Sequence, residues 1–377
     1  MSSTTQQYLF LCSGTFVLSL VLTRIAIAVA RRLDLLAHPV ERSSHSIPTP
    51  QVGGIGICLS LLLTTSVAGS LGLEDAPRLL PDLPVTALWV TFALLVWGMF
   101  LGLIDDILAL DALPKLAGQF VLSALAVWAT RQIPHNDSGP VFGFFGSWLG
   151  LLFVFFWTLF FTNAFNFMDG VNGQSGVFAL NALGWYALMT LSLPDSNWDS
   201  LSPFLLIAAA ILGFLPWNFP RPRTFLGDSG SLPLGVLLAL LAVVASKGNP
   251  ARFVAFLLPL SLYLYDVLLT LVRRSLRGEN VFKAHREHLY QRMLVARGWR
   301  EQHEKLLAFH LPYYVASGAL GYFCLLTQIW GSLWLTCATL AGVVPLLGHY
   351  TWRVLQAEKQ ALLNAEMSSP LDQEKEG

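Results

Sequence analysis

Charged residues are scarce in this chain. Asp, Glu, Lys and Arg make up 12% of its 377 residues, whereas hydrophobic residues make up 54%. Soluble domains carry about a quarter charged residues, so this composition excludes a soluble globular protein. The mean hydropathy of +0.58 agrees. We therefore expect an all-α, polytopic transmembrane protein with membrane lipid around it, and we do not expect nucleic acid among its partners.

Motifs of several common enzyme classes are also absent from the sequence. There is no Walker motif, no Gly-x-Ser-x-Gly turn and no His-Glu-x-x-His helix. Their absence argues against P-loop NTPases, α/β-hydrolases and zincin proteases. The four cysteines lie inside apolar runs without metal-ligand spacing, as expected of small core residues.

Long apolar runs are abundant. About eleven of them are long enough to cross roughly 30 Å of hydrocarbon as helices. They lie at 8–28, 52–72, 85–104, 112–130, 148–164, 175–193, 203–219, 231–246, 251–272, 308–327 and 331–351. The run at 203–219 is short and is broken by Pro216. An odd number of spans places the two termini on opposite sides of the membrane.

Charge is distributed unequally between the loops. Residues 273–305 hold nine basic and four acidic residues, whereas 73–84 and 194–202 are mainly acidic. Basic loops face the cytoplasm, so we expect the N-terminus outside and the C-terminus in the cytoplasm. Residues 1–357 form one membrane domain in this interpretation, and 358–377 form a polar, disordered cytoplasmic tail.

The first loop on the expected cytoplasmic face contains Arg42 and His45, followed by a Pro-Thr-Pro segment and glycines at 53, 54 and 56. The two basic side chains suit an anionic headgroup. Glycine lets backbone approach backbone, or a phosphate, where the second span begins. A simple positive anchor for the membrane surface is the alternative.

Carboxylates and amides end two further runs on the same face. Asp105 and Asp106 are followed by Lys115. Adjacent carboxylates repel unless a cation shares them, and such oxygens together with phosphate suit Mg²⁺. Asn163, Asn166 and Asp169 recur every third residue, which places them on one helix face. When each group is taken alone, the alternative is a solvated helix end with a flanking lysine for the first group and a helix C-cap and turn for the second.

Two more clusters complete the set. Arg223 precedes Gly-Asp-Ser-Gly-Ser, in which Asp228 stands just before a new helix, where a metal–phosphate would meet free backbone N–H groups. His285, Arg286 and His288 lie in the basic loop, with the two histidines one helical turn apart, and suit a diphosphate. Capping and an ordinary basic surface are the alternatives. Asp266 is a lone carboxylate within a span, so it is a candidate functional residue as well.

Taken in order, these five clusters resemble the polyprenyl-phosphate N-acetylhexosamine-1-phosphate transferase family, from about residue 38 to 293. The resemblance implies transfer of a sugar-1-phosphate from a UDP-N-acetylhexosamine to undecaprenyl phosphate, with release of UMP. It also implies a bacterial cytoplasmic (inner) membrane protein that needs Mg²⁺, with Mn²⁺ as a substitute. Neither the sequence nor the resemblance decides whether the protein forms a homodimer.

The resemblance implies roles for individual residues. Asp228 would be a metal ligand, and Asp105 and Asp106 would lie at the metal and prenyl-phosphate centre, as base or as binder. Asp169 would be the fourth catalytic carboxylate. The implied substrate-binding residues are Arg42, His45, Lys115, Asn163, Asn166, Arg223, His285, Arg286 and His288.

The sequence departs from the family pattern in two places. The peptidoglycan enzyme has three consecutive histidines where this chain has His288-Leu289-Tyr290-Gln291, which favours an O-antigen or lipopolysaccharide initiator. Many members have Asp-Gly-x-Asp-Gly where this chain has Asn172 at the second acidic position. A phospho-MurNAc-pentapeptide transferase is the first alternative. A transporter is the second, although no internal repeat supports it.

Overall fold

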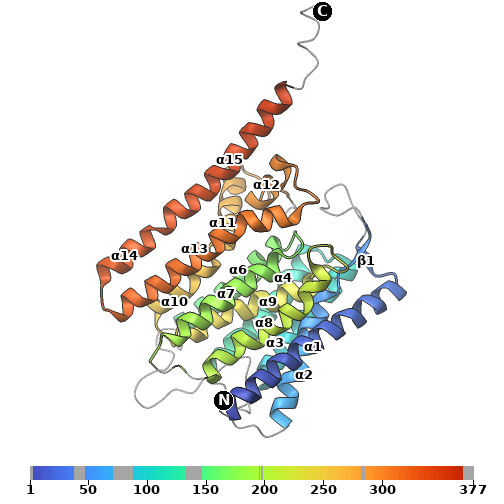
Figure 1. Ribbon diagram of the computed structural model, residues 1–377, viewed down its shortest axis with the longest axis vertical. Coiled ribbons are helices and arrows are strands. Elements are labelled where there is room, and N and C mark those ends of the chain that lie inside the picture. Colours follow the sequence, from blue (N-terminus) through green and yellow to red (C-terminus); the bar gives the residue numbers. More distant parts are fainter. Residues whose placement is uncertain are drawn as a thin grey trace, which may run out of the picture.

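The computed structural model shows a bundle of helices, as the apolar runs predict (Figure 1). It describes residues 3–37, 47–70, 88–132, 147–194, 196, 198–281 and 285–367. The helices of the first half are α1 (Ser3–Arg32), α2 (Gly53–Ser70), α3 (Leu88–Leu108), α4 (Ala112–Arg131), α6 (Trp148–Met168) and α7 (Gln174–Leu191). Two short strands, β1 (Leu36–Ala37) and β2 (Thr49–Pro50), pair antiparallel, with Leu36 opposite Pro50.

The second half is equally helical. It contains α8 (Trp198–Asn218), α9 (Asp228–Ala245), α10 (Pro250–Leu257), the 3-10 turn η2 (Leu258–Leu260), α11 (Ser261–Leu276), α12 (Leu289–Arg297), α13 (His303–Ile329), α14 (Leu333–Ala341) and α15 (Val343–Met367). The run predicted at 251–272 is therefore two helices. Pro259 lacks the N–H that would continue the first helix, so a break there is expected.

Two other details differ from the sequence-based expectation. Pro216 does not break α8, which carries both Pro203 and Pro216 and ends only at Asn218. The segment predicted to be disordered from residue 358 is helical as far as Met367, because α15 extends through it. The rest of that tail lies outside the described residues.

The multi-pass architecture is confirmed. Every predicted apolar run overlaps a helix, and eight helical segments in the described ranges are long and apolar enough to cross a membrane. The expected count of eleven includes α2, α7 and α13, which are not among those eight. The exact count and the orientation stay predictions. Large apolar side chains are exposed on the outside of the bundle, as expected of a surface in contact with lipid. Among them are Phe10, Trp89, Trp148 and Trp334.

Helix α9 forms the centre of the bundle. All its residues from Ser229 to Ala245 are buried, and it packs against α3 and α6 (Figure 1). A helix that is apolar on every side is expected at such a position. Since α9 is surrounded by other helices, its first residue, Asp228, is held in a fixed place.

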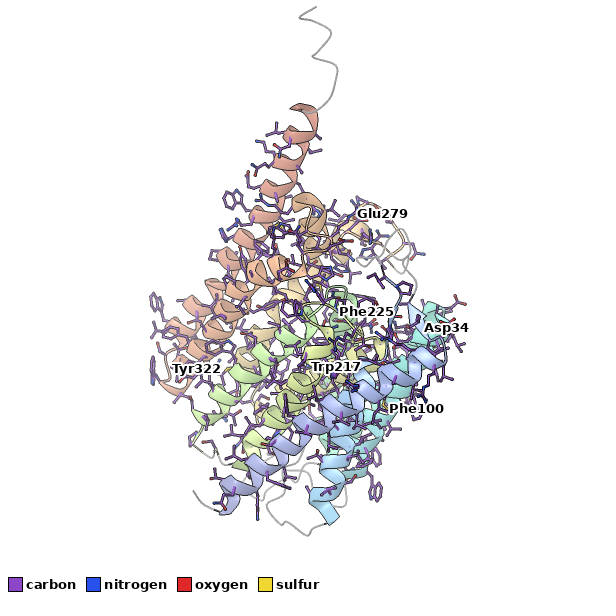
Figure 2. The ribbon with its side chains drawn as sticks, turned by 45° about the vertical axis from the view of Figure 1, so that its right-hand side comes forward. Asp34, Phe100, Trp217, Phe225, Glu279 and Tyr322 are labelled. Carbon is purple, nitrogen blue, oxygen red and sulfur yellow. The ribbon has the colours of Figure 1, made fainter. Side chains whose placement is uncertain are left out.

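Close backbone contacts set the position of the α9 N-terminus. A Cβ on Gly54 would lie 2.1 Å from the Cα of Gly230, so only glycine permits this approach of α2 to α9. The backbone N–H groups of Gly53 and Gly54 also donate to the carbonyls of Phe225 and Leu226. The predicted role of the glycines in backbone-to-backbone contact is thus confirmed. Figure 2 places Phe225 and Asp34 near this end of the bundle.

Helix α15 runs along α13 and continues beyond the bundle (Figure 1). In the second half of α15, Glu358 accepts hydrogen bonds of 2.7 and 2.5 Å from Nε and Nη2 of Arg292 on α12. Such two-point pairing of Arg with a carboxylate is geometrically specific. The short helix α12 is therefore held from outside by the C-terminal helix.

Candidate active site

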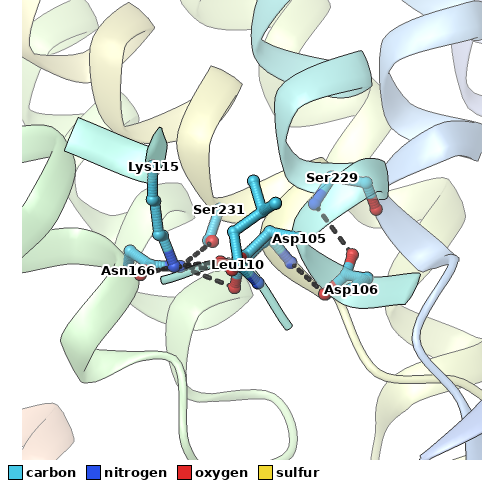
Figure 3. Close-up of polar contacts among 8 residues, drawn as sticks. Asp105, Asp106, Leu110, Lys115, Asn166, Ser229 and Ser231 are labelled. Carbon is cyan, nitrogen blue, oxygen red and sulfur yellow. Dashed lines mark hydrogen bonds and ion pairs between the residues drawn. The ribbon is translucent and has the colours of Figure 1, made fainter. Parts of the chain in front are cut away.

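Lys115, on α4, contacts residues from three other helices, α3, α6 and α9 (Figure 3). Its Nζ lies 2.8 Å from Asp105 Oδ2 and 3.2 Å from Asn166 Oδ1, and it also pairs with Asp228 Oδ2. The three side chains that form ion pairs are only partly exposed, Lys115 at 21%, Asp105 at 14% and Asp228 at 22%. Partial burial strengthens such interactions relative to water. Lys115 and Asp228 are 113 positions apart in the sequence, and the fold brings them together.

Asn166 fixes the orientation of Asp228. Its Nδ2 donates to Asp228 Oδ1 at 2.8 Å and to Ser231 Oγ at 2.8 Å, while its Oδ1 accepts from Lys115. Every polar atom of this amide is therefore used. The structure thus places Asn166 beside Asp228 and Lys115, while its predicted role in substrate binding stays a prediction.

The Asp106 carboxylate contacts the backbone at the start of α9. Its Oδ1 accepts a 2.9 Å hydrogen bond from the backbone N–H of Asp228, and its Oδ2 accepts a 3.1 Å bond from that of Ser229. The carboxylate thus caps the first turn of α9 from a neighbouring helix, in the manner of an N-cap side chain. Gly227, with φ of +73°, leaves room for it, since a Cβ there would lie 2.7 Å from Asp106 Oδ2.

The converging oxygens fit a hard divalent cation. Asp105, Asn166 and Asp228 each direct one oxygen at the Lys115 ammonium. Across the residues described, no group of three or more His, Cys, Asp or Glu side chains is arranged to hold a metal. Mg²⁺ needs only one or two protein carboxylates, because substrate phosphates and water supply its other ligands. Asp105 and Asp228 are the two that could hold it.

A cavity of about 270 Å³ opens beside Asp228. Asp169 and Arg286 line it as well, so three of the residues predicted from the sequence face one space. Its other lining residues are Gln51, Gly170, Val171, Asn172, Asn218, Phe225, Leu226, Gly227, Tyr290, Gln291, Leu294, Val295 and Arg300. They come from five separate loops and helix ends, all of which lie at the same end of the bundle. That gathering agrees with their predicted placement on one face.

Asp169 is the C-cap of α6 and has an unusual environment. Burial raises the pKa of its carboxyl to about 7, and the negative charge of Asp228 adds to the rise. A carboxyl group that titrates near neutrality, in a cavity, is typical of a functional position.

The basic loop is arranged differently from its predicted form. His285 precedes α12 and His288 is its N-cap, so the two are not one turn apart on a helix, although their rings lie 5.0 Å apart. Nδ1 of His288 lies 3.2 Å from Asp266 Oδ1. Asp266 is fully buried, and it also accepts from the backbone N–H groups of Leu289 and Tyr290 at 2.8 and 3.1 Å. It therefore holds the start of α12.

Burial and the neighbouring charges of His288 and Arg274 lower the pKa of His285, so the ring favours its neutral form. Arg274 is itself paired with Glu279 and Glu287, at 2.9 and 2.5 Å. The cationic residue of this predicted cluster that faces the cavity is Arg286.

The comparisons with known proteins agree with this site. Residues 87–246, which include Asp105, Asp106, Lys115, Asn166 and Asp228, match the family model described as glycosyl transferase family 4. Over 348 residues the chain is 32% identical to the decaprenyl-phosphate N-acetylglucosaminephosphotransferase of Mycobacterium tuberculosis, covering 85% of this chain and 83% of that protein. The chain belongs to glycosyl transferase family 4, the polyprenyl-phosphate hexosamine-1-phosphate transferases.

Other members of the family are similar over most of the chain. The undecaprenyl-phosphate alpha-N-acetylglucosaminyl 1-phosphate transferase of Thermotoga maritima is 28% identical, over 74% of this chain and 80% of that protein. The phospho-N-acetylmuramoyl-pentapeptide-transferase of Enterococcus faecalis is 27% identical, over 68% of this chain and 79% of that protein.

Two of the family residues predicted for the site have other contacts. Asn163 donates to the carbonyl of Leu159 in its own helix at 2.8 Å, and the Arg223 guanidinium lies over the Trp217 ring, 5.4 Å from its centroid. Neither lines the cavity. Arg42 and His45 lie outside the described residues, so their role stays a prediction.

Three residues that line the cavity were not among those predicted from the sequence. Tyr290, Gln291 and Arg300 line the cavity from α12 and from the turn that follows it. The only signal in the sequence was the basic character of the 273–305 loop, which contains all three. That character does not distinguish Arg300 from the other arginines of the loop.

Proposed function

We propose that this protein transfers an N-acetylhexosamine-1-phosphate from a UDP-sugar to undecaprenyl phosphate and releases UMP. UDP-N-acetylglucosamine is the first donor to test, because the names of the relatives at 28% and 32% identity include N-acetylglucosamine. The observation that carries the proposal is the cluster of Lys115, Asp105, Asn166 and Asp228 beside a cavity lined by Arg286. It joins oxygen ligands and cations at one place, as phosphoryl transfer requires.

The chemistry consists of one phosphoryl substitution. A phosphate oxygen of undecaprenyl phosphate attacks the sugar-linked phosphorus of the donor, and the bond from that phosphorus to the UMP oxygen breaks. The products are undecaprenyl-diphosphate-sugar and UMP. A phosphate monoester is mostly dianionic at pH 7, since its second pKa is about 6, so no strong general base is required.

The main barrier is the approach of two anions. Lys115 and Arg286 lower it by placing positive charge near the phosphates. Mg²⁺, or Mn²⁺ in its place, would add charge there when bound to Asp105 and Asp228. Asn166 orients Asp228, and Asp106 fixes the α9 N-terminus on which Asp228 stands. Asp106 thus acts in this mechanism by position, and the direct contact with the metal predicted for it from the sequence is not part of the mechanism.

The product suits the first membrane step of a cell-envelope polysaccharide, with O-antigen and lipopolysaccharide as the pathway favoured by the sequence. The active site would face the cytoplasm, where UDP-sugars are made. A phospho-MurNAc-pentapeptide transferase is the second candidate, because such enzymes are among the relatives. His288-Leu289-Tyr290-Gln291, without the histidine triplet, argues against it.

The test uses the purified full chain with undecaprenyl phosphate, Mg²⁺ and a panel of UDP-N-acetylhexosamines that includes UDP-MurNAc-pentapeptide. UMP release is measured, together with radiolabelled lipid product. Asp228→Asn should abolish release. The matched control is Asp111→Asn. Asp111 stands at the N-cap position of α4, but its exposed side chain makes no capping hydrogen bond.

UMP formation that needs both lipid and metal supports the transferase, and the active donor names the sugar. UMP from the pentapeptide donor alone would favour the second candidate. Uptake of a UDP-sugar into vesicles without any lipid product would instead support a transporter.

A further inference from the structure

His303 links two walls of the cavity. It is the first residue of α13 and is only 4% exposed. Its Nδ1 accepts a hydrogen bond of 3.2 Å from the backbone N–H of Asn172, and its Nε2 lies 2.9 Å from the carbonyl oxygen of Arg300. Asn172 and Arg300 both line the cavity, whereas His303 does not. The histidine therefore acts through its neighbours.

The two partners determine which nitrogen carries the proton. A carbonyl oxygen can only accept, so Nε2 must donate to Arg300. A backbone N–H can only donate, so Nδ1 must be the unprotonated acceptor for Asn172. A single neutral tautomer satisfies both contacts, as in histidines whose orientation is set by a second hydrogen bond.

The loop that His303 holds is fixed from its other side too. The N–H of Gly173 donates to Asn218 Oδ1 at 2.6 Å, and Asn218 Nδ2 donates to the carbonyl of Thr224 at 3.0 Å. Residues 171–173 are thus held in place by hydrogen bonds to two other segments. Because His303 bonds both to Asn172 and to the Arg300 carbonyl, it fixes the turn between α12 and α13 relative to this loop.

Arg300 is exposed and faces the cavity. In the described part of the chain, Arg274, Arg277 and Arg292 form ion pairs with glutamates, whereas Arg300 has no carboxylate partner. The cavity contains two carboxylates, Asp169 and Asp228. An anionic donor therefore needs cations around it, and Arg286 and Arg300 are the two arginines that line the cavity.

We propose that Arg300 binds the diphosphate of the nucleotide donor and that His303 is the positioning residue that places it. The proposal rests on the proposed function for the identity of the donor. A guanidinium offers several donors in a fixed fork that matches phosphate oxygens, so its placement matters more than that of a lysine. Since binding the diphosphate precedes the chemical step, a loss of Arg300 should raise KM for the donor more than it lowers kcat.

The experiment measures steady-state UMP release and, separately, UDP binding to the purified full chain in detergent without acceptor lipid. Arg300→Ala should raise KM for the UDP-sugar about tenfold and weaken UDP binding by a similar factor, with kcat changed less than about threefold. Arg297→Ala is the matched control, because Arg297 is the last residue of α12, three residues before Arg300, but it contacts Gln360 and does not line the cavity. It should leave both values unchanged.

Three variants of His303 separate positioning from general packing. Gln places an amide near Nε2 and keeps the donor to Arg300, whereas Asn places its oxygen near Nδ1 and keeps only the acceptor for Asn172. Leu keeps neither. We expect UDP affinity to fall in the order wild type, Gln, Asn, Leu, and we expect Arg300→Ala to add little to His303→Leu.

The outcomes distinguish this proposal from the proposed function. UDP binding that is weakened by both substitutions supports Arg300 and His303 even if no donor gives UMP. UMP formation with an unchanged KM and unchanged UDP binding in Arg300→Ala would overturn the inference and leave the transferase intact. Equal loss in the Gln, Asn and Leu variants of His303, with normal binding in Arg300→Ala, would assign His303 a purely structural role.

Discussion

Asp106 and Asp228 are joined through the backbone: the N–H of Asp228 donates to Asp106 Oδ1 at 2.9 Å, while the Asp228 carboxylate faces Lys115. Two acidic residues of one site therefore have different tasks. Asp106 holds the N-terminus of the central helix, and Asp228 presents its oxygens to the ligand side.

Removal of the Asp106 cap should lower stability. Asp106→Ala leaves two backbone N–H groups without acceptors and should cost about 1–2 kcal/mol, whereas Asp106→Asn retains one acceptor and should cost less. Thermal unfolding of the purified protein measures both. Asp111→Asn, whose side chain makes no cap bond, should melt like the wild type. Normal melting of both Asp106 variants together with lost transfer would place Asp106 in the chemistry instead.

Lys115 neutralises two carboxylates, so its removal should change how the site responds to cations. In Lys115→Met, the charges of Asp105 and Asp228 lose their shared partner. We expect UMP release to fall about a hundredfold or more, and Mg²⁺ to raise the melting temperature of the variant more than that of the wild type. Lys305→Met, an exposed lysine, is the control. An equal Mg²⁺ effect in all three proteins would contradict this account.

The contact between α2 and α9 should tolerate no side chain. In Gly54→Ala, the added Cβ would meet Gly230 at 2.1 Å, so we expect loss of folded protein or a fall in stability of several kcal/mol. Gly184→Ala is the matched control: nothing lies within 4 Å of its Cβ position in α7. Alanine there should be neutral or stabilising by up to about 1 kcal/mol. Equal melting temperatures for the two variants would show that α2 can move away from α9.

Asp169 should make stability depend on pH. Its pKa is raised to about 7 in the folded protein, against about 3.9 in an unfolded chain. Between these values the unfolded chain loses its proton first, so the folded state loses stability as pH rises from about 4 to 7. Asp169→Asn cannot titrate. The melting temperature of the variant relative to wild type should therefore increase from pH 5 to pH 8, measured with EDTA present. A constant difference would indicate an ordinary pKa.

The helices were predictable because lipid leaves the backbone no other way to satisfy its polar groups. The meeting of the polar loops at one end was predictable for a related reason, since alternate loops of a multi-pass chain share a side. Neither argument depends on tertiary detail.

The partners of individual side chains were not predictable. Nothing in the sequence shows that Asp105 faces Lys115 while Asp106 caps a helix 122 residues later. The same holds for His303, whose two contacts lie on backbone atoms of distant segments. Spacing suggested that His285 and His288 share a helical face, but α12 begins only after His288, where Asp266 accepts a hydrogen bond from the N–H of Leu289. At this point a buried carboxylate elsewhere in the sequence, and not the local spacing, determines where the helix starts.

The ion pair between Arg292 and Glu358 has a practical consequence for handling the protein. Because α15 holds α12 through this pair, the C-terminal helix is a structural support for the cavity that α12 lines. An affinity tag or fluorescent fusion attached after Met367 leaves that support complete. A shortened chain that ends before Glu358 would keep every residue of the reaction centre and still lack the outer support of one cavity wall.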